Sequence, residues 1–285
     1  MSVRIITDSG SDFLPGEHPA LDVLPLSIAF GETTYQADVD LDRERFYELL
    51  VEGDTFPTTG QVNPYAFTQA LERAAQAGDD AVIVTISAKL SGTHQSACTA
   101  AAQARAAGQE VHVVDSRSVT VGEYVLARYA LRLVEQGLSA AQIAAELERA
   151  QERICVVGLL DTLEYLKRGG RISAAAGTVG ELLSIKPVIA IEDGEVALLG
   201  RARGSKNGRN LLHQQVLAAG GIDFSMPVML GYSGLSDKLL RKYIEDSRSV
   251  WEAHVGRDEL PVLLVGATIG THVGPGAVAV AFFRA

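Results

Sequence analysis

The sequence contains very little cysteine, since its 285 residues include only Cys98 and Cys155. These two form no Cys-x-x-Cys pair, which excludes a disulfide framework and a zinc ribbon and fits a reducing cytosol. Basic residues are also in the minority, because 25 Lys and Arg stand against 35 Asp and Glu and give a net charge of −10. Affinity for phosphate backbones needs clustered Lys and Arg, so this balance argues against a general nucleic-acid-binding protein.

A secretory leader is not expected, because Asp8 interrupts the N-terminus before an apolar run has formed. Residues Leu260–Phe283 contain no Asp, Glu, Lys or Arg and are long enough to span a bilayer. The same segment contains Pro261, Pro275, His272 and four glycines, which favours two buried strands around a loop. We therefore expect a soluble, cytoplasmic protein without a membrane span.

The common catalytic and nucleotide-binding motifs are missing: the sequence has no GxSxG, GxGxxG, GxxxxGK[ST] or HExxH. Their absence removes the usual signatures of α/β-hydrolases, dinucleotide-binding domains, P-loop proteins and zincins. With 47% hydrophobic and 21% charged residues, the chain is nevertheless typical of a globular protein with a sizeable core. The remaining candidates are polar residues at the ends of predicted strands, where open α/β sheets bind their ligands.

Short strands rich in Val and Ile alternate with amphipathic helical segments along the first half of the chain. The predicted strands are Val3–Thr7, Val23–Phe30, Ala81–Ser87 and Val111–Asp115. The predicted helices are Pro64–Ala77, Gly92–Ala107, Val121–Gln136 and Ala140–Arg153. This alternation predicts a parallel sheet with helical crossovers.

The second half begins with a different order of elements, because Val188–Ile191 and Val196–Leu199 are two predicted strands that flank a hairpin turn. The other predicted elements of this half are strands at Cys155–Leu159, Pro227–Tyr232, Val262–Val265 and Ala277–Phe283 and helices at Thr162–Lys167, Gly208–Ala219 and Asp237–Ser247. This change in the order of strands and helices predicts two α/β domains, residues 1–153 and 154–285.

Three polar strings lie next to predicted strands or helices. Asp8 ends the first strand, where it could hold a metal, orient a hydroxyl, or simply form an Asx-turn or helix cap. Thr58, Thr59 and Gly60 offer two hydroxyls and a backbone N–H to an anion, or form an ordinary turn. Ser91 precedes a predicted helix, whose N-terminal N–H groups favour a carboxylate or phosphate. A simple Ser N-cap is the alternative.

Positive charge gathers at two places. Lys167, Arg168 and Arg171 surround a glycine pair at a predicted helix end, where they could match the helix dipole or dock an acidic surface or a phosphate. Arg201 and Arg203 follow the second hairpin strand and could close an anion site or lie on an ordinary surface.

His272 lies in the unusual string Gly270–Gly276, which contains three glycines and a proline. Its apolar surroundings predict a desolvated imidazole, either structural or functional. The glycines indicate that the backbone turns tightly beside it, which is typical of places that something approaches closely. We therefore favour a functional role for this histidine.

Taken in order, these strings resemble the DegV family of bacterial fatty-acid-binding proteins, and the resemblance runs from residue 4 to the C-terminus. The strings that carry it are Ile6–Ser9, Pro57–Gln61, Leu90–Thr93, Asp115–Ser116, Leu166–Ile172, Lys186–Pro187 and Gly270–Gly276. The resemblance implies one DegV unit over about residues 3–284, with an N-terminal parallel-sheet α/β domain, a C-terminal α/β domain and a lipid tunnel between them.

The resemblance also implies a function. Members of this family hold a long-chain fatty acid such as hexadecanoate and present its carboxylate to a separate fatty acid kinase, which makes the acyl phosphate for phospholipid metabolism. This protein would then be a lipid carrier without catalytic residues, metal or cofactor. Its partners would be the fatty acid and the kinase, with at most transient contact with a membrane surface.

Residue by residue, the resemblance implies that Thr59 and Ser91 bind the carboxyl group, with Gly60 and Gly92 beside them. His272 and Arg201 would lie nearby, and Arg171, Lys167 and Arg168 would form the surface that meets the kinase. The sequence departs from the family pattern at Gly60, where Ser is common, and at Val62, where Pro is common. One hydroxyl contact is therefore lost or replaced by a backbone amide.

Two other functions remain open at this stage. Ser91, His272 and Asp8 could form the nucleophile, base and orienting acid of a hydrolase, because triads are defined by geometry and not by sequence order. Alternatively, the same pocket could bind a phosphate ester at the helix N-terminus with the help of Arg171.

Overall fold

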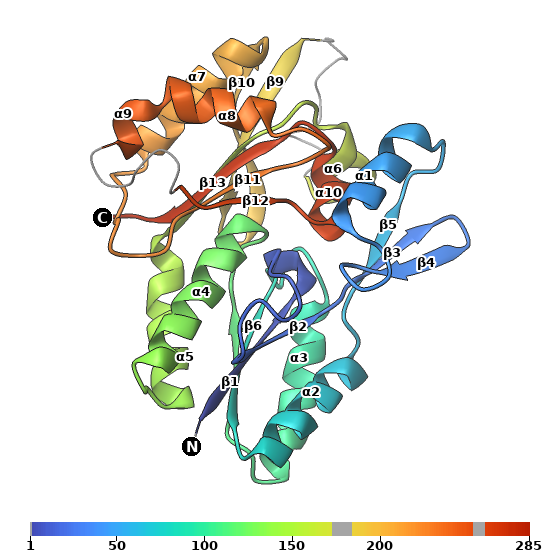
Figure 1. Ribbon diagram of the computed structural model, residues 1–285, viewed down its shortest axis with the longest axis vertical. Coiled ribbons are helices and arrows are strands. Elements are labelled where there is room, and N and C mark those ends of the chain that lie inside the picture. The colour runs from blue at the N-terminus through green and yellow to red at the C-terminus, as the bar shows by residue number, and fades with distance from the viewer. Residues whose placement is uncertain (1, 173–183, 253–259) are drawn as a thin grey trace.

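The first half of the chain forms a four-stranded parallel sheet in the computed structural model, which describes residues 2–172, 184–252 and 260–285. The strand order is β2-β1-β6-β7, with β1 at Val3–Asp8, β2 at Leu21–Leu24, β6 at Asp80–Thr85 and β7 at Val111–Asp115. Helices α2 (Pro64–Ala77) and α3 (Thr93–Ala106) cover one face, and α4 (Val121–Glu135) and α5 (Ala140–Ala150) cover the other (Figure 1). The predicted parallel sheet is confirmed.

The helix boundaries follow from local capping. Asn63 accepts a hydrogen bond from the Ala66 N–H with Pro64 at the first helical position, so α2 begins as predicted. Ser139 and Gln142 form a reciprocal capping box at the start of α5. The predicted helix Ala140–Arg153 ends earlier as an α-helix, because its last turn, Gln151–Arg153, is a 3₁₀ helix.

The second sheet has six strands in the order β10-β9-β8-β13-β11-β12, and only the β11–β12 pair is parallel. Its strands are β8 (Ile154–Leu159), β9 (Ile185–Glu192), β10 (Glu195–Arg203), β11 (Met229–Tyr232), β12 (Val262–Leu264) and β13 (Val278–Phe283). Helices α7 (Ser205–Ala218), α8 (Lys238–Asp246) and α9 (Arg248–Trp251) cover its outer face (Figure 1). The inner face packs on α4, since Val156, Met229 and Ala281 share a core with that helix.

A third, small sheet was not predicted. The expected strand Val23–Phe30 is wrong as a single element: it is divided into β2 and β3 (Ser27–Phe30), which lie in different sheets. Pro25 stands at the break and has no N–H for a continuous ladder. Strand β3 pairs with β4 (Thr33–Gln36) and β5 (Thr58–Gly60), and α1 (Arg43–Glu52) packs beside them.

The uncharged stretch Leu260–Phe283 contains the two expected strands, β12 and β13, but the segment between them is not a loop. It forms helix α10 (Ala267–Val273), which contacts both α1 and the short helix α6 (Glu164–Arg168). The tight turn comes only after it, where Gly274 and Gly276 have φ of 69° and 81°. Within the described ranges, no helix is long and apolar enough to cross a membrane.

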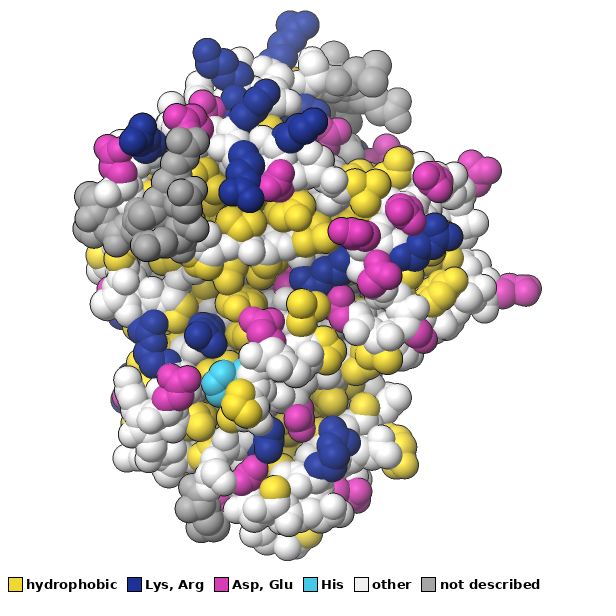
Figure 2. Space-filling view, viewed as in Figure 1, with side chains coloured by type: hydrophobic (Ala, Val, Ile, Leu, Met, Phe, Trp, Pro, Cys, Tyr) yellow, Lys and Arg dark blue, Asp and Glu magenta, His cyan; other side chains and the backbone are white. Residues whose placement is uncertain are grey.

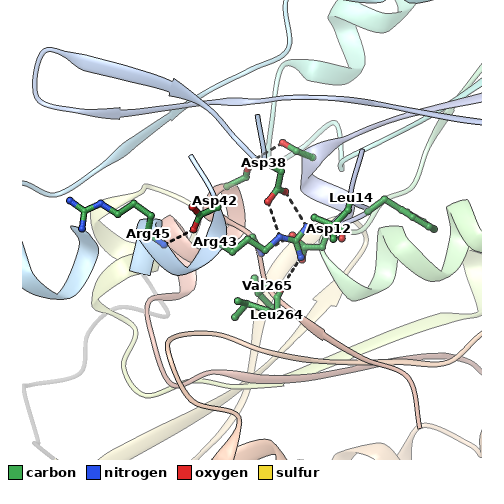
Figure 3. A network of polar contacts seen from close by, with 12 residues as sticks. Asp12, Leu14, Asp38, Asp42, Arg43, Arg45, Leu264 and Val265 are labelled. Atoms are coloured by element: carbon green, nitrogen blue, oxygen red, sulfur yellow. Dashed lines mark hydrogen bonds and ion pairs between the residues drawn. The ribbon is translucent and has the colours of Figure 1, made fainter. Parts of the chain in front are cut away.

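Arg43 on α1 joins three parts of the fold (Figure 3). Its guanidinium donates to both carboxylate oxygens of Asp38, at 2.9 and 3.0 Å, and to the Asp12 carbonyl at 2.9 Å. It also donates to the Leu264 carbonyl at the end of β12. The small sheet is thereby tied to the carboxyl end of β1 and to the six-stranded sheet, and these three parts enclose the cavity described next.

Candidate functional site

A cavity of about 420 Å³ lies where the carboxyl ends of the parallel strands face the six-stranded sheet. Most of its wall is aliphatic. Residues just after β6 and β7 form one side, strands β8 and β9 form another, and α10 closes the third; examples are Ile86, Val119, Val156, Ile189 and Ile269. Its volume lies in the range of about 300–1,000 Å³ that small-molecule sites occupy. The wall therefore favours a ligand with a long apolar part.

One end of the cavity is polar, and Thr59 and His272 meet there. Thr59 on β5 and His272 on α10 place Oγ1 and Nε2 at 3.0 Å. Burial, and second the positive charge of Arg171, lower the pKa of His272 to about 4. The imidazole is therefore neutral near pH 7, and it offers one donor and one acceptor.

The two nitrogens of His272 have different surroundings. Nδ1 is buried and has no hydrogen-bond partner among the described residues. It faces Gly169, where a Cβ would stand only 2.1 Å from it. If Nε2 carries the proton, it donates to Thr59 Oγ1 and leaves the threonine proton free to point into the cavity. His272 can thus orient Thr59 as a donor to an anion.

Ser91 and Gly92 lie at the same end of the cavity, just before α3. The helix begins at Thr93, one residue later than predicted, so Ser91 precedes its N-cap residue. Ser91 Oγ lies 2.9 Å from Thr93 Oγ1 and accepts from the Thr93 N–H at 3.3 Å. A Cβ at Gly92 would stand 2.0 Å from Gln61 Oε1, so a side chain at this position would displace the Gln61 amide from the mouth of the cavity.

Gly60 also lines the cavity, at the position where the family pattern commonly has a serine hydroxyl. Ser27 is the register partner of Gly60 on β3. A Cβ at Gly60 would stand 2.3 Å from Ser27 Oγ. The space that a serine at this position would need is thus filled by Ser27 from the neighbouring strand. The sequence pattern contains no signal for this exchange, because it depends on the register of a three-stranded sheet.

The structure corrects the prediction for Arg171, which was expected on a docking surface outside the pocket. Arg171 lines the cavity and is half-buried. Its guanidinium donates to the carbonyls of Gly169 at 2.6 Å and Leu90 at 3.3 Å. It is the one permanently charged side chain among the described lining residues. The glycine pair turns the chain so that Arg171 returns toward the cavity.

The other predicted cations lie elsewhere. Lys167 and Arg168 are exposed on α6, and Arg168 lies over the Phe56 ring, 5.2 Å from its centroid. Arg201 was expected near the anion site, but its side chain is exposed on β10 and is absent from the described cavity wall. The structure therefore brings Thr59, Gly60, Ser91, Gly92 and His272 together, and it does not bring Arg201 to them.

The structure does not assemble the hydrolase triad that the sequence left open. Asp8 is fully buried, and its carboxylate accepts from the backbone N–H groups of Gly10 and Ile86, each at 2.9 Å. Burial raises the pKa of Asp8 to about 7. His272 Nε2 is engaged with Thr59, and Ser91 with Thr93. Asp8 thus has the structural Asx-turn role, and no hydrogen bond joins Ser91 to a histidine among the described residues.

A group of buried carboxyls below the cavity was missed by the sequence analysis. Glu123 on α4 accepts from Thr7 Oγ1 at 3.1 Å, and its second oxygen is buried without a partner in the described part of the chain. Asp12 accepts from the Thr120 hydroxyl at 2.6 Å and from the Gly266 N–H at 2.8 Å. Thr120 also lines the cavity, so this group supports its floor.

The fold and cavity define an α/β protein with an apolar pocket that has a small polar end. Sequence comparison gives the family: a family model described as "Uncharacterised protein, DegV family" matches residues 2–285. The chain is 34% identical over 288 residues to a DegV domain-containing protein of Deinococcus radiodurans, which covers 99% of this chain and 98% of the relative. This protein belongs to the DegV family, and the predicted resemblance is confirmed.

Solved structures agree with this assignment. A fatty-acid-binding DegV family protein from Thermus thermophilus has a TM-score of 0.86 at 30% identity, and the match covers 100% of both chains. The fatty acid kinase (Fak) B3 protein of Streptococcus pneumoniae, solved with linoleic acid, has a TM-score of 0.88 at 24% identity, again over 100% of both chains. The predicted two-domain DegV-like α/β fold is therefore confirmed.

Proposed function

We propose that this protein binds a long-chain fatty acid in the cavity, with the carboxylate at the polar end. The observation that carries the proposal is the composition of the wall, which is mostly aliphatic and has Thr59, Ser91, Arg171 and His272 at one end. Each buried methylene contributes ~0.8 kcal/mol, so a 16-carbon chain supplies on the order of 10 kcal/mol before other costs. The related Thermus thermophilus protein, described as fatty-acid-binding, supports the same ligand class.

The carboxylate needs partners, because an isolated buried charge would cancel much of that gain. Arg171 supplies the positive charge, and the hydroxyls of Thr59 and Ser91 supply donors. Neutral His272 directs the Thr59 proton toward the carboxylate. Charge-assisted hydrogen bonds of this kind are about twice as strong as neutral ones. A phosphate ester would also suit this end of the cavity, but the aliphatic remainder favours an acyl chain.

Mass spectrometry of the purified protein tests the ligand class directly. Native spectra should show a bound mass that organic extraction identifies as a long-chain fatty acid. A protein that stays in the ligand-free form and takes up neither palmitate nor oleate contradicts the proposal. Labelling of Ser91 by a fluorophosphonate would instead support the hydrolase alternative, since an unactivated serine does not react.

Thr59→Val tests the position of the carboxylate, with Thr58→Val as its matched control. Thr59 lines the cavity, whereas Thr58 is its exposed neighbour on the same strand. Loss of one hydrogen bond to a charged group costs about 1–3 kcal/mol, which is about 5- to 150-fold in affinity. We expect that loss for Thr59→Val and a similar one for Ser91→Ala, with Thr58→Val unchanged. Equal affinities in all three variants would place the head group elsewhere.

We further propose that the loaded protein presents the carboxylate to a separate fatty acid kinase, which makes the acyl phosphate. The motif resemblance supports this step, and the exposed cations Lys167 and Arg168 on α6 lie on the same short segment as Arg171. Exposed charges chiefly steer association, and salt weakens their effect.

Charge reversal tests this docking surface. Lys167→Glu should lower phosphorylation of bound palmitate by a purified bacterial fatty acid kinase, most strongly at low salt, while palmitate affinity stays the same. Lys238→Glu, at the start of α8 on the outer face, is the control. If Lys167→Glu is phosphorylated at the wild-type rate at all salt concentrations, α6 is not the docking surface.

A further inference from the structure

The six-stranded sheet has an opening at the end of the cavity formed by β8 and β9. Strand β8 pairs with β13 from Ile154 to Leu159, but it pairs with β9 only from Val157 to Leu159. Beyond the pair Val157–Ala190 the ladder stops, although β9 continues to Glu192. Val156 and Ile191 are the next residues on the two strands, so they stand at the point where the sheet is no longer closed by backbone hydrogen bonds.

A second cavity, of about 470 Å³, adjoins this opening. Val156, Ala190 and Ile191 line both cavities and therefore separate them. The second cavity is formed by the loop after β7, the 3₁₀ turn at Gln151–Arg153, the turn of the β9–β10 hairpin and the end of α7. The first cavity is thus closed at this end only by the side chains that separate it from the second cavity.

The two cavities differ in chemistry. Charged and amide side chains line the second one, including Arg117, Glu152, Glu192 and Arg284. Ser118 and Gln151 also line it, so much of its wall is polar. Polar and charged walls favour water over a methyl group. An acyl chain therefore gains from filling the first cavity and loses that gain on passing Val156 and Ile191.

Helix α4 fixes the position of Val156 between the two cavities. Val156 is 6% exposed, and its side chain lies against Gly122 of α4, where a Cβ would stand 2.3 Å from Val156 Cγ2. Val156 cannot retreat toward α4 without moving the helix, since interiors are close-packed. Its side chain is consequently a fixed stop at the end of the cavity.

We propose that Val156 and Ile191 form the end wall of the acyl cavity and set the longest chain that the protein accepts. This inference rests on the proposed function and adds a determinant of chain length to it. A smaller side chain at Val156 or Ile191 extends the first cavity toward the second. An added side chain inside the first cavity shortens the space left for the acyl chain.

The test compares the acyl chains bound by Val156→Ala and Ile191→Ala with those bound by the wild type. Each protein is given an equimolar mixture of saturated fatty acids from 12 to 22 carbons, and the bound species are extracted and identified by mass spectrometry. Val156→Ala removes two carbons from the wall, so the preferred chain should lengthen by about two methylenes. The control is Val188→Ala, a buried position on β9 outside both cavities, which should leave the preference unchanged.

A substitution in the opposite sense keeps the proposal testable if the truncated variants fold poorly. Gly158 lines the cavity on the same strand, and a Cβ there would have its nearest neighbour at 3.5 Å, an ordinary contact. Gly158→Ala should fold and should shift the preference toward shorter chains. An unchanged distribution in Gly158→Ala and in every folded wall variant overturns the end-wall inference. A wild type that binds no fatty acid overturns the proposed function itself.

Discussion

At the scale of single residues, the candidates at the polar end of the cavity could be found in the sequence, but the buried carboxyl groups beneath the cavity could not. Thr59, Ser91 and His272 each stand in a short string with glycines, which local sequence shows. The contacts of Glu123 join residues 116 positions apart, and no local pattern marks a glutamate that will be buried on α4. The glycine pair indicates a turn before Arg171, but nothing in the local sequence shows that the turn directs this arginine into the cavity wall, so it was expected at the surface.

Glu123→Gln should remove a pH-dependent loss of stability. Burial first, and the charge of Asp8 second, raise the pKa of Glu123 well above its ordinary 4.5, so the folded protein keeps this carboxyl protonated. The unfolded chain releases the proton above about pH 4.5, hence stability falls as pH rises from there to the folded pKa. Each such proton contributes up to about 1.4 kcal/mol per pH unit.

Urea denaturation at pH 5, 7 and 9 measures this effect. The free energy of unfolding of Glu123→Gln should exceed that of the wild type by an amount that grows with pH. Glu110→Gln, an exposed carboxyl beside β7, is the control and should follow the wild-type curve. A constant difference across the three pH values contradicts the buried-proton explanation.

At the scale of elements, capped helices and long strands were predicted well, and short paired strands were not. Asn63-Pro64 and the Ser139 capping box mark helix starts by local chemistry. Strand β5 has three residues and pairs only with β3, so its extended shape comes from register with a distant segment and the sequence favoured a loop. Helix α10 is short, and its glycine-rich sequence is typical of turns, yet packing of Gly270 against Phe46 and Tyr47 keeps it helical.

Arg43→Met should destabilise the protein strongly, because it removes the link between α1, the end of β1 and β12 (Figure 3). The Arg43 and Asp38 side chains are only 10% and 6% exposed, so the change leaves a buried carboxylate without its cation. Loss of one partner from a buried ion pair costs about 3–5 kcal/mol.

Arg45→Met is the matched control on the same helix, since Arg45 pairs with Glu48 at the surface. It should leave the denaturation midpoint nearly unchanged. Denaturant melts of both variants, followed by circular dichroism, give the comparison. Equal small shifts for the two substitutions would mean that Arg43 does not hold the three parts together.

At the scale of the whole molecule, composition predicted a globular core and the order of elements predicted two α/β domains, but neither predicted which surfaces of the two domains meet. The cavity wall draws on both sheets, on the small sheet and on α10, so it exists only when all of these have assembled. Charge is also divided: Figure 2 shows basic side chains gathered over α7 and α8 and acidic ones over the part that contains α1. The net charge of −10 is therefore spread unevenly over the surface.

Removal of the ligand should lower the stability of the entire fold and not of one half. A ligand that binds only the folded state stabilises it by RT ln(1 + [L]/Kd), which is about 2.7 kcal/mol at a hundredfold excess over Kd. Because residues of both halves line the cavity, the ligand-free protein should melt earlier in a single step when followed by calorimetry. Reloading with palmitate should restore the melting temperature, whereas octanoate, which fills half of the same space, should restore less. Identical melting of loaded and delipidated protein would show that the acyl chain is not enclosed between the sheets.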